Sequence, residues 1–325
     1  MVELPPLDEL IAHDPSGADL EPIGSSREGR PILALRRGTG PHRVSLIAGC
    51  HADEPIGPLL LRHWACALDR LEDAHPLVRA FQWWIVPHAN PDGEARNAEA
   101  CRRSGDIYDL DAVVSHLVRE LPGEDLEFGF PRSPEDRDAR PETRAIAEWW
   151  RCDPRPWVLH ASLHGMALSS GPWFLIDAAW IDRTELLRDH LGRRVTAMGY
   201  TPRDVDRGGE KGFTRIAPGF TTRPSSVAMR EHFEQLGDPK TAALFRPSSM
   251  ETIRAMTPDA LTLVSECPLF LADETPELLA RWAEARATRT LDAVLANAVR
   301  PMSIRDQLEL VWMFLGEGLR AAVDG

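Results

Sequence analysis

The stretch of sequence that decides the fold reads VSLIAGCHADE and runs from Val44 to Glu54. Its first six residues are almost continuously apolar, which is typical of a strand buried on both faces. His51 and Glu54 follow at once, so an imidazole and a carboxylate stand three residues apart in the first turn after a strand. That spacing lets both side chains reach one metal ion, because zinc accepts histidine nitrogen and carboxylate oxygen. A capping carboxylate beside a surface histidine would give the same short pattern.

Outward from this stretch, strands and helices alternate along the chain. We predict strands over 32–37, 44–49, 81–87, 157–163, 172–177 and 261–266, and helices over 58–71, 141–150 and 183–198. Apolar strands separated by helices predict an α/β fold of three layers, α/β/α, around a central mixed, largely parallel sheet. Residues 200–226 hold four glycines with several prolines and charges, which predicts a long loop that could act as a lid. Amphipathic spacing over 275–325 predicts a C-terminal helical addition.

Composition excludes several classes of protein. The 325 residues carry 37 basic and 50 acidic side chains, a net charge of −13, so we expect no nucleic-acid partner and no membrane partner. The first ten residues, MVELPPLDEL, lack the basic and apolar regions of a secretory signal, and no segment is apolar enough to cross a membrane. Five scattered cysteines without a CxxC pair predict reduced thiols. We therefore expect a cytoplasmic protein whose residues 1–325 form a single catalytic domain.

Two further residues stand where they could complete a site with His51 and Glu54. His164 follows the apolar stretch WVLHASL, where a sheet presents side chains at its edge, although a hydrogen-bonded core histidine would look alike. His160, on the same face of that strand, is expected to be structural or to support the site. Glu266 closes the apolar stretch LTLVSE. Burying its carboxylate costs free energy unless a cation or a proton compensates, and a catalytic base beside zinc would explain it.

Several segments, in order, resemble the zinc carboxypeptidase family, the group of carboxypeptidase A with its cytosolic peptidase and acyl-amino-acid deacylase relatives. They are IGSSREGRPI (23–32), HADEPIG (51–57), PHANPDG (87–93), ARPETRAIAEW (139–149), SLHG (162–165) and the glutamate of the last strand, Glu266. The resemblance covers residues 23–268. It implies one zinc ion per chain held by His51, Glu54 and His164, with Glu266 as general base and later proton donor. A carboxylate near an activated water can perform both proton transfers.

The resemblance also implies an arginine that stabilises the negative charge developing on the substrate oxygen. In the family it lies between the N-P-D-G turn and the next aspartate. Arg102 fits this spacing best, with Arg103 adjacent and Arg96 a weaker candidate. A solvated loop charge is the alternative for each of them.

The chain departs from the family in the run Asp-Leu-Asn-Arg, whose Asn and Arg grip the substrate carboxylate. Residues 109–112 (Asp-Leu-Asp-Ala) or residues 125–128 (Asp-Leu-Glu-Phe) could take its place, and both lose the Asn-Arg pair. The candidate substrate-binding residues are then Asp111 or Glu127, and Glu127 would favour a cationic or amide group. Alternatively, an arginine of the glycine-rich loop could restore anion binding: Arg203, Arg207 or Arg215. Ser162 stands where many relatives have an aspartate, so the surroundings of His164 are altered.

Three functions are compatible with the sequence. The first is a zinc-dependent hydrolase that cleaves a peptide or peptide-like amide, a metallopeptidase of carboxypeptidase type. The second is a deacylase of N-acyl amino acids, similar to succinylglutamate desuccinylase and aspartoacylase. The third is a non-catalytic module that binds zinc or a ligand. The ligand set and the base favour an enzyme, with a peptide or an acyl-amino acid as its substrate.

Overall fold

The computed structural model describes residues 3–324 and contains one large sheet. Its strand order is β1-β2-β4-β3-β7-β11-β8-β10-β9, with β12 paired to β11. Four neighbouring strands form a parallel centre: β4 (Phe81–Val86), β3 (His42–Ala48), β7 (Trp157–Ser169) and β11 (Leu261–Leu271). The outer strands are β1 (Glu21–Ser25), β2 (Pro31–Arg37), β8 (Trp173–Ile176), β9 (Arg215–Ala217), β10 (Phe220–Thr222) and β12 (Arg300–Pro301). Since most outer strands pair antiparallel, the prediction of a mixed sheet is confirmed.

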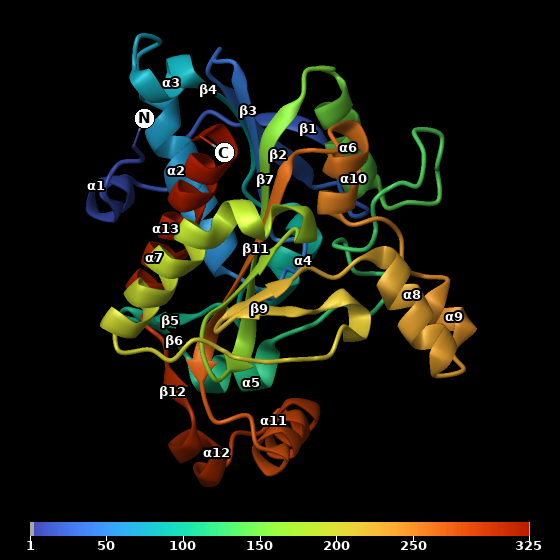
Figure 1. Cartoon of the computed structure of the whole chain (residues 1–325). Helices are drawn as coiled ribbons and strands as arrows, with labels where there is room; N and C mark the ends of the chain where they lie inside the picture. Colours follow the sequence, from blue (N-terminus) through green and yellow to red (C-terminus); the bar gives the residue numbers. More distant parts are fainter. Residues whose placement is uncertain (1–2, 325) are drawn as a thin grey trace.

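Helices cover both faces of this sheet (Figure 1). One face carries α1 (Leu7–Ile11), α2 (Ile56–Asp69), α7 (Glu185–Ala197) and α13 (Ile304–Asp324). The other carries α6 (Pro141–Arg151) and α10 (Ser249–Met256). The remaining elements are α3 (Pro76–Ala80), α4 (Pro91–Asn97), α5 (Leu110–His116), α8 (Ser226–Gln235), α9 (Pro239–Ala242), α11 (Pro276–Thr288), α12 (Ala293–Ala298) and the ribbon of β5 (Arg103–Ser104) and β6 (Ile107–Tyr108). The three-layer arrangement is confirmed, and none of the described helices has the length and apolarity needed to span a membrane.

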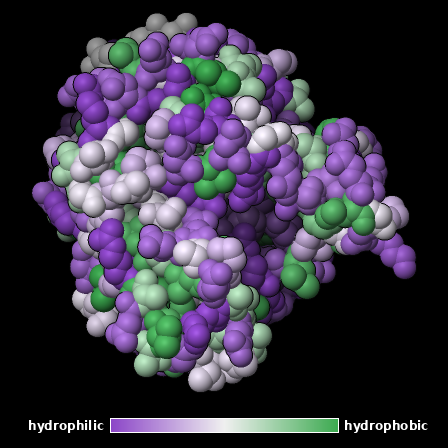
Figure 2. Space-filling model, turned by 60° about the horizontal axis from the view of Figure 1, so that its bottom comes forward, coloured by the Kyte–Doolittle hydropathy of each residue, from purple (hydrophilic) through white to green (hydrophobic). Residues whose placement is uncertain are grey.

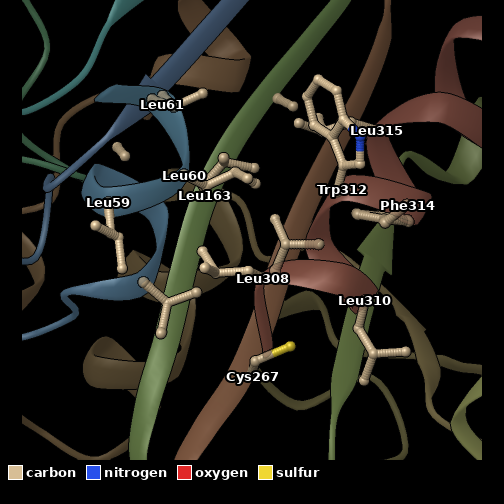
Figure 3. Close-up of a cluster of buried hydrophobic side chains, with 14 of the residues drawn as sticks. Leu59, Leu60, Leu61, Leu163, Cys267, Leu308, Leu310, Trp312, Phe314 and Leu315 are labelled. Atoms are coloured by element: carbon tan, nitrogen blue, oxygen red, sulfur yellow. The ribbon is translucent and has the colours of Figure 1, made fainter. Parts of the chain in front are cut away.

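The largest hydrophobic core lies between the sheet and α2 and α13 (Figure 3). Leu60 of α2 and Leu163 of β7 are fully or almost fully buried, and so are Phe314 and Leu315 of α13. Burying a leucine or phenylalanine side chain contributes roughly 1.5–3 kcal/mol each. Helix α13 is therefore part of the central layer structure, whereas α11 and α12 match the expectation of an addition beyond the core.

The predicted strands and helices are all present, with their ends shifted by a few residues except for β7 and β11, which extend further. The expected long loop over 200–226 needs a correction, because it contains β9 and β10, which extend the sheet beyond β8. Each of these strands has three residues, too few for an alternating pattern to stand out among glycines and prolines.

Candidate metal centre and active site

The turn between β3 and α2 carries the first two candidate ligands, His51 and Glu54. Strand β3 ends at Ala48 and α2 begins at Ile56, so both side chains stand at the carboxyl edge of the parallel strands. Gly57 lets this turn lie close to β7, because a Cβ atom there would come within 2.5 Å of the Leu163 carbonyl oxygen. Ligands of open α/β sheets bind at this edge.

Strands β7 and β11 bring the two remaining residues to the same edge. They are parallel, and His164 on β7 is paired in register with Glu266 on β11. On the other side of β11, Glu266 is paired with Trp173 on β8. The three side chains therefore form one row across three neighbouring strands, since residues in register point to the same face of a sheet. The backbone N–H of Gly165 donates to Glu54 Oε2 at 3.2 Å and ties the turn to this row.

The structure brings His51, Glu54 and His164 together as a compact group of possible metal ligands. One donor atom from each lies within 4.8 Å of the others. His51 Nδ1 is 2.9 Å from Glu54 Oε1, His164 Nδ1 is 2.8 Å from Glu54 Oε2, and the two Nδ1 atoms are 3.1 Å apart. Two imidazole nitrogens and one carboxylate are a ligand set typical of hydrolytic zinc sites, which keep a further position for water.

The outer nitrogens of both imidazoles are held by carboxylates. His51 Nε2 lies 3.2 Å from Asp125 Oδ1, and His164 Nε2 lies 3.1 Å from Glu127 Oε2. The Ser162 hydroxyl oxygen is also 2.8 Å from His164 Nε2. Such partners fix the orientation of a metal-binding histidine and raise its basicity. Both Nδ1 atoms thereby face the common centre.

The carboxylates around the two imidazoles favour a positive charge in this group. Burial and Arg119 act to lower the pKa of His51, but Glu54 and Asp125 outweigh them and raise it well above its usual range. Burial also acts to lower the pKa of His164, but Glu54 and Glu127 outweigh burial and raise it to about 10. The carboxylates would therefore stabilise a divalent cation in the place of these protons. The residues present fit zinc.

Glu266 stands beside this group without a hydrogen-bonding partner for its buried Oε2 atom among the described residues. Burial, and then repulsion by the charge of Glu54, raise the pKa of Glu266 to about 8. A buried carboxylate with no partner costs free energy, and such groups concentrate at functional sites. Its position between His164 and Trp173 suits a group that acts on a bound water or substrate.

The structure does not bring the expected oxyanion arginine, Arg102 or Arg103, to the site. Arg102 is exposed and donates to Asp109 Oδ2 at 2.8 Å, and Arg103 is exposed on the β5–β6 ribbon with its guanidinium over Tyr108. Neither belongs to the pocket around the candidate ligands. The spacing was misleading because residues 98–108 turn away from the sheet edge to form this ribbon.

Arg119, which the sequence analysis missed, occupies the pocket instead. Its Nη1 donates to Asp53 Oδ2 at 3.1 Å and to Glu54 Oε1 at 2.7 Å. Although burial acts against the charge, these carboxylates raise the pKa of Arg119 above its usual range. A signal for it was present, since Arg119 precedes the aspartate of residues 125–128 by only six positions.

Of the two segments proposed to replace the lost Asn-Arg pair, residues 125–128 lie at the site. Asp125 contacts His51, while Glu127 and Phe128 line the pocket. Asp111 is exposed in the first turn of α5 and outside the pocket lining, so the structure does not bring this candidate substrate-binding residue to the site. Glu127 is at the site, but its Oε2 is bound to His164 and Ser162, which makes it a positioning residue rather than a free contact for substrate.

A pocket of about 500 Å³ opens over these residues. Its walls are largely apolar and come from four regions: β8 with Trp173 and Leu175, the loop over 200–226 with Phe213, α8 with Met229, and α11 with Trp282. Figure 2 shows a hollow between the body of the molecule and the projection on the right, where Figure 1 places α8 and α9. Helix α11 is fixed beside the opening, because Arg286 donates to the carbonyl oxygens of Val113 and Leu117.

Two histidines and a carboxylate at the strand ends of an α/β/α sheet, with a fourth acidic group beside them, define the class of metal-dependent hydrolases. A family model described as zinc carboxypeptidase matches residues 6–173, more than half of the 325 residues. The chain belongs to the zinc carboxypeptidase family.

Curated relatives support this membership. Carboxypeptidase D of Drosophila melanogaster is 33% identical over 167 residues, which cover 47% of this chain and 12% of that protein. Carboxypeptidase M of Mus musculus is 33% identical over 162 residues, 46% of this chain and 34% of that protein. The chain thus matches well under two thirds of the length of either relative. The matches include a Talaromyces marneffei protein named an inactive metallocarboxypeptidase, 26% identical over 43% of this chain, so membership alone does not establish catalysis.

Solved structures extend the likeness of fold to almost the whole chain. A Shewanella amazonensis protein, solved as a candidate metallopeptidase, superposes with a TM-score of 0.55 at 14% identity and covers 96% of this chain and 91% of its own. Because the identity is so low, this likeness concerns the fold alone. It includes the part beyond residue 173, which the family model does not match.

Proposed function

We propose that the chain is a zinc-dependent peptidase that hydrolyses a peptide or peptide-like amide bond, with Glu266 as general base. The single observation that carries the proposal is the convergence of His51, Glu54 and His164 inside one pocket, beside Glu266, whose buried Oε2 atom has no partner among the described residues. Membership of the zinc carboxypeptidase family supports it.

His51, Glu54 and His164 would hold one zinc ion, and Asp125 and Glu127 would keep the two imidazoles in the required orientation. When bound, zinc supplies a Lewis acid that lowers the pKa of water and polarises a carbonyl group. The remaining chemistry belongs to side chains of this chain.

Glu266 would move the proton. The pKa of about 8 holds for the site without a cation, and a divalent cation held by the neighbouring ligands would lower it. The ionised carboxylate, beside His164 at the floor of the pocket, would then accept a proton from the attacking water and return it to the leaving nitrogen. Arg119 supplies the cation closest to the ligands and would stabilise negative charge on the carbonyl oxygen of the substrate. These two roles replace the pairing of Glu266 with Arg102 or Arg103 that the sequence predicted.

The apolar walls favour substrates with a hydrophobic side chain next to the scissile bond. Trp173, Leu175, Met250 and Val264 form one apolar cluster beside Glu266 and the ligands. Transfer of such a side chain from water contributes roughly 25 cal/mol per Å² of apolar surface buried.

The test is hydrolysis by the zinc-loaded protein. We expect cleavage of a short-peptide library, loss of activity with a chelator, recovery with zinc, and about one zinc ion per chain by elemental analysis. A panel of N-acyl amino acids assayed in parallel identifies a deacylase if only that panel is cleaved. Stoichiometric zinc without cleavage of either panel would instead indicate a binding module.

A further inference from the structure

A chain of buried polar side chains leads from the outer nitrogen of the candidate ligand His164 into the layer between the sheet and α10. It begins at Glu127, whose Oε2 lies 3.1 Å from His164 Nε2. Glu127 Oε1 accepts from the Ser249 hydroxyl at 3.4 Å. Ser249 Oγ lies 3.1 Å from His160 Nε2, and His160 Nδ1 lies 2.9 Å from Ser45 Oγ. The chain therefore connects β3, β7 and α10 to one side chain of the candidate metal centre.

The far end of this chain lies in an apolar part of the core. His160, Ser45 and Ser249 are fully buried, each with 0% of its surface exposed. The His160 ring packs against Trp150, with the ring centres 5.3 Å apart and the planes at 80°. Replacing both partners of a buried hydrogen bond by apolar groups of the same shape can be nearly neutral for stability. Packing alone therefore does not explain why polar groups stand here.

Hydrogen-bond chemistry fixes the direction of every bond in this chain. The Glu127 carboxylate can only accept, so Ser249 donates its single hydroxyl proton to it. Ser249 Oγ must then accept from His160, which places the proton of a neutral imidazole on Nε2. His160 Nδ1 in turn accepts from the Ser45 hydroxyl. Burial, and then the charge of Arg223, lower the pKa of His160 to about 3, so the ring is neutral at neutral pH.

At the near end, the chain holds both oxygens of the Glu127 carboxylate. Oε1 accepts from Ser249, while Oε2 accepts from the Ser162 hydroxyl at 3.3 Å and from His164 Nε2. The bond on Oε1 opposes rotation of the carboxylate, which a contact on Oε2 alone would allow. In the neutral ring that a metal ligand requires, a proton on Nε2 of His164 leaves Nδ1 unprotonated and directed at Glu54 Oε2, 2.8 Å away. The orientation of Glu127 thereby sets the tautomer of the ligand.

We propose that His160 is a positioning residue of the metal centre: it fixes Glu127 through Ser249, and so fixes the tautomer and orientation of His164. The inference rests on the proposed function only in requiring zinc at His51, Glu54 and His164, and it does not depend on the substrate. A histidine that serves the fold alone would leave zinc binding unchanged when it is replaced.

The first test measures zinc affinity by competition with a chromogenic chelator. His160→Phe keeps a planar ring without hydrogen bonds, and we expect the affinity to fall by about 3- to 10-fold, less than the effect of removing a direct partner of a ligand. Ser249→Ala should cause a similar loss, and the double variant should lose no more than either single variant, because both changes act through one contact.

Two further variants separate positioning from packing. His160→Gln, whose amide can still donate to Ser249, should retain most of the affinity. Thr252→Ala is the matched control, because Thr252 is buried on the same helix and its hydroxyl donates only to the Ser248 carbonyl oxygen in the part of the chain that the structure describes. Its thermal stability should fall while its zinc affinity stays at the wild-type level. Zinc affinity of His160→Phe within about twofold of wild type would overturn the inference, and so would an equal loss in Thr252→Ala.

The second test detects the tautomers directly, by long-range ¹H–¹⁵N correlation of the imidazole nitrogens in the zinc-loaded protein. We expect His160 and His164 to carry their protons on Nε2, and the Nε2–H proton of His164 to exchange faster with water in Ser249→Ala. A proton on Nδ1 of His160 would overturn the inference, since the chain could not then run towards Glu127. Wild-type protein that binds zinc and cleaves no peptide would refute the proposed function alone, whereas wild-type protein without zinc would refute both.

Discussion

The floor and the outer wall of the pocket are built on different principles. The floor consists of the candidate ligands His51, Glu54 and His164 with their supports, and almost every charge in it has a partner within hydrogen-bonding distance. The outer wall, made by the loop over 200–226 and by α11, is mostly apolar, and its Arg207 has no acidic partner among residues 3–324. A network of paired charges fixes the geometry of the floor, whereas a mostly apolar wall selects which substrates enter the pocket.

Glu266→Gln would sharpen this contrast most, because the buried Oε2 atom of Glu266 has no hydrogen-bonding partner in the part of the chain that the structure describes. We expect kcat to fall by about 10²- to 10⁴-fold, the usual contribution of a general acid–base group. Zinc content should stay at the wild-type level, since Glu266 is not among the ligands. Glu234→Gln, an exposed glutamate on α8, is the control and should behave as wild type. Full activity of Glu266→Gln would contradict the assigned role.

Arg119→Ala tests whether the floor, rather than the exposed ribbon, supplies the oxyanion cation. We expect kcat/KM to fall by about 10²- to 10³-fold. Arg102→Ala should change it by less than about twofold, because Arg102 is exposed and pairs with Asp109 outside the pocket. Steady-state kinetics on one peptide substrate measures both. A larger loss of kcat/KM in Arg102→Ala than in Arg119→Ala would instead support Arg102 as the oxyanion arginine, as the sequence spacing suggested.

Glu127→Gln and Asp125→Asn remove the charge behind each histidine ligand. Zinc affinity should fall by about 10- to 100-fold in either variant. Competition with a chromogenic chelator gives the affinity directly and does not depend on turnover. Asp111→Asn, which changes an exposed residue of α5, is the control and should leave the affinity unchanged. Unchanged zinc binding in Glu127→Gln would indicate that Glu127 serves substrate instead.

The prediction with the smallest expected effect on activity concerns the stability of the outer wall. Burial acts to raise the pKa of Glu274, but its hydrogen bonds with Arg203 and Ser170 outweigh burial and lower it to about 2. The unfolded value is about 4.3, so the charged pair contributes up to about 3 kcal/mol at neutral pH, fully present above about pH 5 and lost as the pH falls through about 2. Glu274→Gln should therefore lower the free energy of unfolding at pH 7, by a margin that shrinks in acid. Asp204→Asn, which breaks an exposed pair, should cost less than about 1 kcal/mol at any pH. Denaturant unfolding across this pH range provides the measurement.

The sequence predicted the floor far better than the wall, for a physical reason. His51, Glu54, His164 and Glu266 all follow or close apolar strands, and parallel strands bring such positions to one edge whatever the loops between them do. Their metal and catalytic roles stay predictions until zinc and activity are measured. The supporting residues were harder, because Arg119 and Asp125 lie in loops whose path depends on tertiary packing.

The second half of the chain shows the same limit. Amphipathic spacing revealed helices after Thr275, but it could not show that α13 packs into the main core while α11 lies beside the pocket. The strands β9 and β10 were missed because pairing with β8 and with each other, not local preference, forms them.

The geometry of the floor depends on two glycines, because a Cβ atom at either position would collide with neighbouring backbone atoms. One methyl group at Gly57 would collide with the backbone of β7, and one at Gly165 would approach the Cys267 carbonyl oxygen to 2.9 Å. Either substitution would push the strands and the turn apart and so increase the distances among His51, Glu54 and His164, although none of these candidate ligands is itself changed. Laboratory evolution of new specificities should therefore tolerate wide variation in the outer wall of the pocket and almost none at Gly57 and Gly165.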